Sequence, residues 1–129
     1  MNEADYNNLS SHIIHSVIEV HKALGPGLLE GIYEDALLYE LRENGLSVKQ
    51  QVPIDIRYKK LELKNGYFAD IIVEEKIILE LKATEHIQPI HKAQLLSYLK
   101  LTDLKLGLLI NFHEVRVTKG ITRIINGYL

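Results

Sequence analysis

Three charged side chains interrupt two consecutive apolar segments near the middle of the chain. Asp70 lies within "GYFADIIV", and Glu80 and Lys82 lie within "KIILELK". Strands so rich in Ile, Leu and Val are expected to be buried on both faces, where an unpaired carboxylate or ammonium group is costly. These charges therefore need partners. Two carboxylates beside a lysine can hold a divalent cation and act on a phosphate ester.

The spacing of Asp70 and Glu80 allows their carboxylates to meet across one antiparallel hairpin. A loop with an odd number of residues, centred on Glu75, places Asp70 opposite Glu80, and strand periodicity puts Lys82 on the same face as Glu80. The opposed carboxylates repel, and Mg²⁺ (or Mn²⁺) would offset this repulsion more fully than Lys82 does. An even loop would instead place Asp70 opposite Leu81 and turn Glu80 to the other face, so the hypothesis depends on register.

Helical periodicity predicts two helices before this hairpin. Ser10 or Ser11 can cap the first helix, whose apolar residues recur at helical spacing as far as Leu24. The "GPG" segment at residues 25–27 ends that helix, and the second is expected over residues 28–44. The helix positions matter because they decide which side chains can reach the hairpin carboxylates.

The rest of the chain alternates between strand and helix patterns. Strands are expected between residues 46 and 63, with a turn at residues 59–60 or 64–66. After the hairpin come a helix with Pro89 in its first turn, a buried strand, and one or two short closing strands, over residues 87–101, 105–112 and 114–127. This order predicts a single domain over residues 1–129 with an α/β fold, in which a central mixed β-sheet is flanked by helices on both faces.

Composition excludes several classes of protein. The chain has 129 residues, of which 47% are hydrophobic and 25% charged, as expected of one globular domain. It contains no cysteine, so any metal must be held by oxygen or imidazole ligands. No apolar segment is long enough to cross a bilayer and no leader pattern starts the chain, so we expect a cytoplasmic protein that does not enter a membrane.

Histidines and lysines could also form sites, but the sequence favours simpler roles for most of them. No H-E-x-x-H motif accompanies the histidines, so zinc chemistry is not expected, and His21 is expected to be a buried, hydrogen-bonded residue. The net charge of −2 requires any nucleic-acid binding to use local basic patches. Two groups of lysines could flank a groove over the site, or form an ordinary solvated surface: Lys49, Lys59, Lys60 and Lys64, and Lys92, Lys100 and Lys105.

The residues of the hairpin resemble a known catalytic core. Asp70 followed by Glu80-Leu81-Lys82 is similar to the D…(D/E)-x-K pattern of the PD-(D/E)XK nuclease superfamily. Ala69 stands where that pattern nominally has proline. In addition, "QLLSY" supplies Gln94-x-x-x-Tyr98, which resembles the RecB-type branch of the superfamily.

A second motif lies upstream. The segment "GLLEGIY" matches Gly27-x-x-Glu30-x-x-Tyr33, the signature of the small GxxExxY proteins, which are assigned to the same superfamily. The resemblance implies a restriction-endonuclease-like core and site residues on the second helix. Glu30 would stand in the first turn of that helix, with Glu34 as its substitute one turn later. Tyr33 is expected to pack in the core with its hydroxyl group hydrogen-bonded.

The resemblance also implies roles for the remaining residues. Asp70 and Glu80 would hold the metal, with the carbonyl group of Leu81 as a further ligand, and Lys82 would orient the attacking water and stabilise charge on the phosphate. Two other sets of residues complete the expected site: Glu30 at the metal, and Gln94 and Tyr98 positioning phosphate or water.

The sequence thus predicts a Mg²⁺-dependent nuclease that hydrolyses phosphodiester bonds, with DNA as the expected substrate. The alternative is a non-catalytic module that keeps the nuclease fold and binds a protein or nucleic-acid partner. A homodimer is compatible with either function, because one small domain can contact only a short length of duplex.

Overall fold

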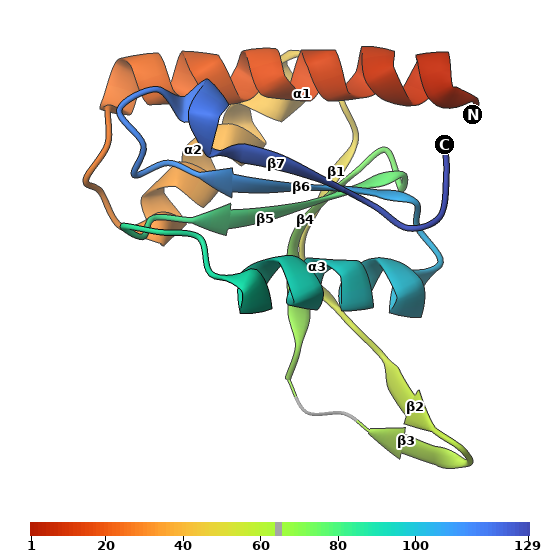
Figure 1. The fold of residues 1–129 in the computed structure, drawn as a ribbon. Coiled ribbons are helices and arrows are strands. Elements are labelled where there is room, and N and C mark those ends of the chain that lie inside the picture. The colour runs from red at the N-terminus through yellow and green to blue at the C-terminus, as the bar shows by residue number, and fades with distance from the viewer. Residues whose placement is uncertain (64–65) are drawn as a thin grey trace.

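The order of helices and strands follows the predicted alternation closely. The computed structural model describes residues 1–63 and 66–129 (Figure 1). Its elements are α1 (Glu3–Leu24), α2 (Glu30–Glu43), β1 (Val48–Pro53), β2 (Ile56–Tyr58), β3 (Leu61–Leu63), β4 (Phe68–Val73), β5 (Ile77–Lys82), α3 (Pro89–Thr102), β6 (Leu106–Asn111), the 3₁₀ turn η1 (Val117–Gly120) and β7 (Ile121–Ile125).

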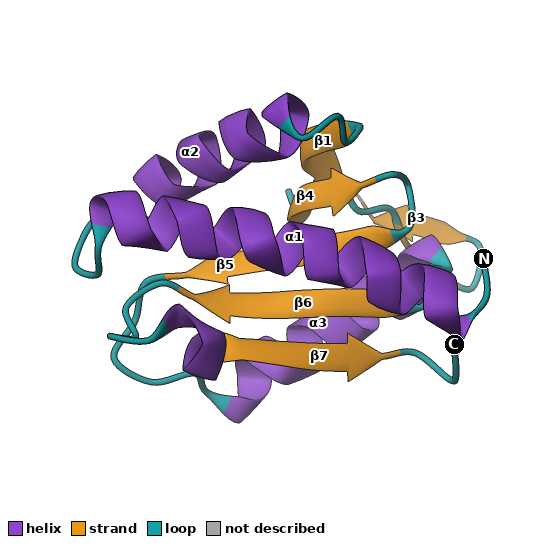
Figure 2. Cartoon of the chain, turned by 90° about the horizontal axis from the view of Figure 1, so that it is seen from above, coloured by secondary structure: helices purple, strands orange, loops and turns teal. Residues whose placement is uncertain are grey.

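The central sheet is mixed, as the sequence predicts. Its strand order is β1-β4-β5-β6-β7, in which β5 and β6 are parallel and all other neighbours are antiparallel. Helix α3 connects the two parallel strands. Helices α1 and α2 pack with one face of the sheet and α3 with the other, so each face has its own hydrophobic cluster (Figures 1 and 2). The α/β prediction with helices on both faces is confirmed.

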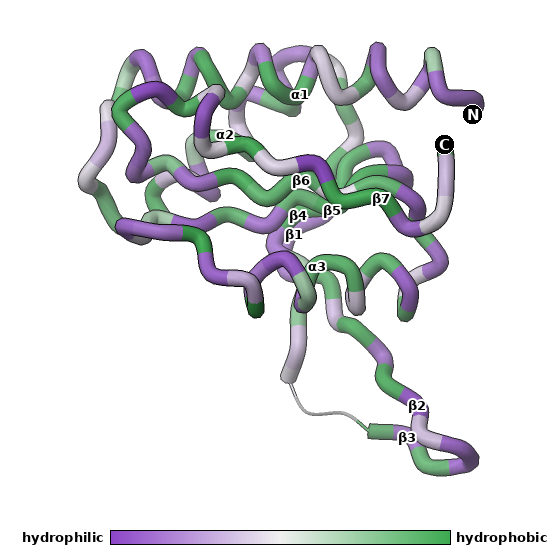
Figure 3. The backbone as a smooth tube through the Cα atoms, viewed as in Figure 1, coloured by the Kyte–Doolittle hydropathy of each residue, from purple (hydrophilic) through white to green (hydrophobic). Residues whose placement is uncertain are grey.

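The strands at the centre of the sheet are its most hydrophobic part. Figure 3 colours the chain by the hydropathy of each residue. All residues of β6 are buried, and so are all residues of β5 except Lys82. A strand with neighbours on both sides and helices on both faces has no solvent-facing side. Glu80 is therefore carried into the interior by the strand that bears it.

Helix α1 starts earlier than the sequence analysis predicts. The expected start at Ser10 or Ser11 is wrong, because Asn2 caps the helix instead. The Asn2 side chain accepts the backbone N–H of Asp5 (2.9 Å), and the Asp5 carboxylate accepts that of Asn2 (3.0 Å). This reciprocal capping box satisfies two free N–H groups of the first turn. Ser10 lies inside the helix, where its hydroxyl donates to the carbonyl of Asn7.

The ends of the first two helices agree with the predictions. Helix α1 ends at Leu24 and is followed by Gly25, whose φ of 69° lies in the left-handed region that glycine adopts readily. Helix α2 begins at Glu30, which places this carboxylate at the first helical position. The loop between the two helices therefore determines where Glu30 lies.

The predicted strands between residues 46 and 63 divide between two sheets. Strand β1 joins the central sheet, whereas β2 and β3 form a separate hairpin that projects from the body beside α3 (Figure 1). Its turn falls at the predicted Lys59–Lys60 position. Two residues of the alternative turn, Lys64 and Asn65, lie outside the described residues. At the end of the chain, one closing strand follows the 3₁₀ turn.

In residues 1–63 and 66–129, no helix combines the length and apolar character that a bilayer crossing requires.

Close packing of α3 on β6 gives a test of the fold. A Cβ atom at Gly107 would lie 2.8 Å from Cδ1 of the fully buried Leu95, so Gly107→Ala should destabilise the protein by about 1–3 kcal/mol through overpacking. The matched control is Gly31→Ala on α2, where a new Cβ meets nothing within 4 Å. This change should stabilise by about 0.4–1 kcal/mol. Urea denaturation measures both, and equal effects would contradict the packing of α3 on β6.

Candidate functional site

The register of the β4–β5 hairpin decides which charged residues meet. Ile72 pairs with Ile78, and the turn consists of Glu74, Glu75 and Lys76. This is the odd loop centred on Glu75. The register on which the metal-site hypothesis depends is therefore the one observed, and the even-loop alternative is wrong.

Side chains replace the backbone ladder at the point where β4 and β5 separate. The last ladder pair is Ile71 with Leu79. Beyond it, the Asp70 carboxylate accepts the backbone N–H of Leu81 (2.9 Å), and the backbone N–H of Asp70 points to Oε2 of Glu80 (3.4 Å). The carboxyl groups of Asp70 and Glu80 are therefore neighbours at the end of the hairpin.

Burial makes Glu80 an unusual carboxyl group. Its side chain is 6% exposed, and Oε1 has no hydrogen-bond partner among the described residues. Removal from water, the side-chain hydrogen bond to Asp70 and the charge of Asp70 raise the pKa of Glu80, the backbone N–H of Asp70 and the charge of Lys82 lower it, and the net result is a pKa of about 9. Without a cation, Glu80 is thus protonated at neutral pH, and one buried oxygen still lacks a partner among the described residues.

Lys82 stands at the end of β5, where the neighbouring strand is fixed by a buried amide. Lys82 pairs with Asn111 of β6. The Asn111 side chain accepts the backbone N–H groups of Thr84 and His113 (both 3.2 Å) and donates to the carbonyl of Thr84 (2.9 Å). These bonds hold the chain that leaves β5. Sequence analysis did not select Asn111, although a polar residue ending the apolar run "LGLLIN" was a usable signal.

Helix α2 brings two carboxylates toward the hairpin. Glu30 is exposed at the start of α2, yet partial removal from water raises its pKa; the charge of Lys82 lowers it, and Asp70 and Glu34 raise it again. These influences place Glu30 near the hairpin charges. Glu34 is engaged differently, because its carboxylate accepts hydrogen bonds from Gln50 (2.7 Å) and Gln51 (2.9 Å) on β1.

Tyr33 fixes the loop that precedes Glu30. Its ring is fully buried and stacks on Phe112, with ring centroids 4.4 Å apart. Its hydroxyl group donates to the carbonyl of Gly25 (2.5 Å) and accepts the N–H of Leu28 (3.0 Å). The prediction of a core tyrosine with a bonded hydroxyl is confirmed.

His21 lies beside this stack and has a structural role. It is half-buried, its Nε2 atom is 2.8 Å from the carbonyl oxygen of Glu114, and its ring lies against Phe112. The expected hydrogen bond of His21 is confirmed, whereas the expected full burial is wrong.

Tyr98 approaches the carboxylates from the α3 side of the sheet. It is buried, and its ring lies edge-on against Tyr67, with centroids 6.4 Å apart. Removal from water raises the pKa of Tyr98 to about 12, with further contributions from Glu80, Tyr67 and Asp70. Gln94 lies one turn earlier on the same helix and is half-buried.

Gln51 is the residue that the sequence did not indicate. Its side-chain amide reaches both Glu34 and Asp70, and its backbone has a positive φ of 49°. Consecutive polar residues in β1 show neither alternation nor a motif, so no sequence signal could have identified it.

The oxygen atoms of this site suit a hard divalent cation that takes only a few of its ligands from the protein. The described residues contain no group of three or more His, Asp or Glu side chains placed to hold a metal. Asp70 and Glu80 are nevertheless adjacent. The N–H and C=O groups of one residue in a strand point to the same side of that strand. Because the N–H of Leu81 points to Asp70 on β4, the carbonyl of Leu81 faces β4 as well. Magnesium commonly uses one or two carboxylates and several waters. The partnerless Oε1 of Glu80 supports this fit.

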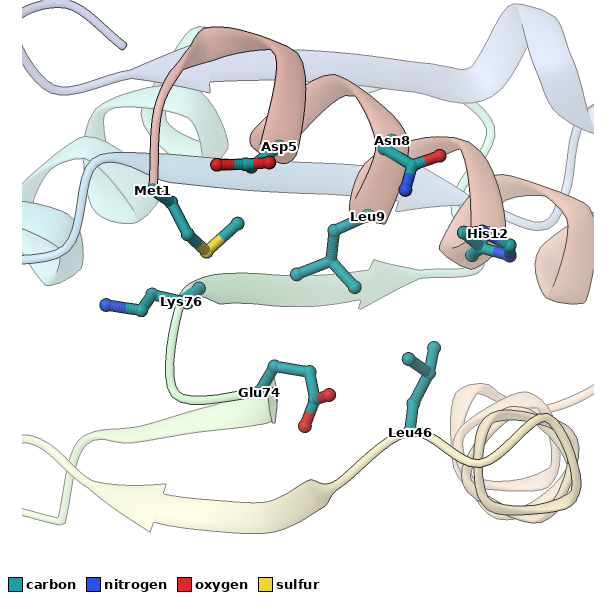
Figure 4. Close-up of a pocket in the computed structure, with 8 residues that line it drawn as sticks. All are labelled: Met1, Asp5, Asn8, Leu9, His12, Leu46, Glu74 and Lys76. Carbon is teal, nitrogen blue, oxygen red and sulfur yellow. The ribbon is translucent and has the colours of Figure 1, made fainter.

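A pocket of about 560 Å³ lies at the opposite end of the hairpin (Figure 4). Its lining is Met1, Asp5, Asn8, Leu9, His12, Leu46, Glu74 and Lys76. Asp5 is engaged in the α1 capping box, and Glu74 accepts the backbone N–H of Ser47. None of the predicted site residues lines this pocket. The charged residues that could do chemistry lie at the other end of the hairpin, so we place the candidate site at Asp70 and Glu80.

Comparison with known families agrees with this assignment of the fold. The sequence model of the PD-(D/E)XK nuclease superfamily matches residues 7–124. The chain belongs to this superfamily. No curated protein and no solved structure shows a significant match. Membership in the PD-(D/E)XK superfamily indicates a nuclease-like function and interaction with nucleic acid, and nucleases of this superfamily generally use divalent metal ions.

The raised pKa of Glu80 predicts how stability depends on pH without metal. Because its pKa is near 9 when folded and near 4.5 when unfolded, the folded state holds the extra proton between these values. The stabilisation is complete below pH 4.5 and is lost as pH rises toward 9. In EDTA, the free energy of unfolding should fall by up to about 1.4 kcal/mol per pH unit across this window. Glu80→Gln should remove most of this slope in urea titrations, and an unchanged slope would contradict the assignment.

Proposed function

We propose that the protein is a Mg²⁺-dependent nuclease that hydrolyses phosphodiester bonds, with DNA as its substrate. The observation that carries this proposal is the buried Glu80 carboxyl, which is adjacent to Asp70 and has one oxygen with no hydrogen-bond partner in the described part of the chain. A structural carboxyl would be expected to have its hydrogen bonds satisfied within the protein. A cation held by both residues accounts for this oxygen and offsets the cost of placing two carboxyl groups together.

Each residue of the site has a distinct task in this proposal. When bound, a divalent cation supplies charge neutralisation at the phosphate and a lowered pKa of water. Asp70, Glu80 and the Leu81 carbonyl would hold this cation. Lys82 orients the attacking water and stabilises the negative charge that develops on the phosphoryl oxygens. The hydroxyl of Tyr98 lies on the α3 side, where it can donate a hydrogen bond to a phosphate oxygen.

Glu30 and Gln94 complete the proposed site from two helices. Glu30 would act at the cation through a hydrogen bond to water, since its carboxylate is exposed and near Lys82 but does not form a three-ligand cluster with Asp70 and Glu80 among the described residues. Gln94 acts with Tyr98 on the substrate phosphate. We also propose that the chain is one of the GxxExxY proteins. The position of Glu30 at the start of α2 and the bonds of Tyr33 to the preceding loop support this.

A binding module that does not cleave is the second candidate function. The β2–β3 hairpin favours it, because Tyr58 and Leu61 on the hairpin are 61% and 57% exposed. They lie on the same face, as directly paired residues do. Lys59 and Lys60 at the tip would contact a phosphate backbone, or the hairpin would meet a second copy of the chain in a homodimer.

Substitution of the three hairpin charges separates these functions. Asp70→Ala and Glu80→Ala should each lower Mg²⁺ and Mn²⁺ affinity at least about tenfold, because each removes a ligand. Glu80→Ala should leave the metal-free fold as stable or more stable, since a buried carboxyl next to another acid is removed. Lys82→Ala should retain metal affinity but lower kcat about 100–1,000-fold. Calorimetry and cleavage of labelled DNA and RNA measure these effects.

Lys22→Ala serves as the control for the loss of a lysine. Lys22 is exposed in the last turn of α1 and has no place in the proposed site, so this variant should match the wild type. If the wild type binds no divalent ion at millimolar concentration and cleaves neither polymer, the nuclease proposal fails and the binding module takes its place.

A further inference from the structure

Gln51 has a backbone conformation that its side chain does not favour. It lies in the middle of β1, yet its φ is 49°, in the left-handed region that costs free energy for residues other than glycine. The β1–β4 register pairs Gln50 with Ile71 and Val52 with Ala69, which leaves Gln51 opposite Asp70 without a ladder pair. The distortion therefore occurs where β1 passes the carboxylate of the proposed site.

The Gln51 amide lies between two carboxylates from different elements. Its Nε2 atom is 2.9 and 3.2 Å from the two oxygens of Glu34 on α2, and 3.3 Å from Oδ1 of Asp70 on β4. Ionised carboxylates only accept hydrogen bonds, so the NH₂ end of the amide faces both. One side chain thus links the second helix to the strand that carries Asp70.

Asp70 is held by two strands as a result. Its Oδ2 atom accepts the N–H of Leu81 on β5 (2.9 Å), and its Oδ1 atom accepts from Gln51 on β1 (3.3 Å). With one bond to each oxygen, rotation of the carboxylate about its Cβ–Cγ bond is restricted. Fixed orientation of a ligand by outer hydrogen bonds raises metal affinity.

The neighbouring Gln50 provides a natural comparison. Its amide donates to Glu34 (2.7 Å), and within residues 1–63 and 66–129 it makes no hydrogen bond to Asp70. It makes an ordinary ladder pair with Ile71, and its φ is not positive. Two adjacent residues of the same type therefore share one partner, and only Gln51 has both the distortion and the bond to Asp70.

We propose that Gln51 is a positioning residue of the site, and that β1 is distorted so that the Gln51 amide can hold Asp70 against Glu34. In this arrangement Glu34 is the anchor of the amide, and Glu30 is the carboxylate of α2 that is left to act at the cation. The inference rests on the proposed function, because the orientation of Asp70 matters most if it holds a cation.

Replacement of each glutamine by glycine tests this role. Gln51→Gly removes the amide and also relieves the positive φ, so its melting temperature should be unchanged or raised while Mg²⁺ affinity falls about tenfold. Gln50→Gly should show the opposite pattern, with a lower melting temperature and unchanged Mg²⁺ affinity. Scanning calorimetry and Mg²⁺ titration of the metal-free proteins, without nucleic acid, measure the two quantities.

A measurement without metal separates this inference from the proposed function. Because Asp70 accepts the Leu81 N–H, loss of Gln51 should speed hydrogen exchange of the Leu81 amide about tenfold, with no change at Leu79. Wild-type affinity and Leu81 protection that both persist in Gln51→Gly would overturn the inference. If the wild type binds no Mg²⁺, the proposed function fails, and Leu81 exchange alone then decides whether Gln51 positions Asp70.

Discussion

The cost of holding two carboxyl groups together inside a hydrophobic sheet is the constraint around which this molecule is arranged. Glu80 lies on a strand with neighbours on both sides and helices on both faces, so water cannot solvate it. Asp70 meets it because the hairpin has an odd turn. The protein meets part of this cost with the proton that Glu80 keeps and with a nearby lysine, and one oxygen of Glu80 has no partner among residues 1–63 and 66–129. A site that is incompletely satisfied without a ligand is suited to binding one.

The surrounding elements fix the geometry of this pair from several directions. The buried amide of Asn111 holds the chain after β5, and the hydroxyl of Tyr33 holds the loop before α2. Tyr98 of α3 is buried near the carboxyl pair, on the face of the sheet that α3 covers. The Asn111 amide and the Tyr33 hydroxyl are buried polar groups with hydrogen-bond partners, and such groups specify position more than they add net stability. The segments on either side of the carboxyl pair are therefore held by specific hydrogen bonds as well as by packing.

The sequence was sufficient for features governed by local rules. Strand periodicity limited the register of the hairpin to two alternatives, of which only the odd turn puts Asp70 and Glu80 together, and the structure decided between them. The glycine after α1 and the proline at the start of α3 marked helix ends through their backbone preferences. The start of α1 was missed because serines near residue 10 offered an equally plausible cap, and only the capping box at Asn2 decides the matter. Gln51 could not be found, because its role depends on a distortion and on partners that meet only in the folded chain.

The three-residue turn between β4 and β5 also has a consequence for the order of folding. Closing so short a loop costs little chain entropy. Pairing of β5 with β6 must instead close a loop that contains the whole of α3. The approach of Glu30 to the hairpin closes a still longer loop. The two acids can therefore meet in a hairpin that is still solvated, where high dielectric weakens their repulsion. Their desolvation falls to the later step, when α3 and the remaining strands cover them. The late docking of α3, rather than the early turn, is then the step at which the carboxyl pair opposes folding.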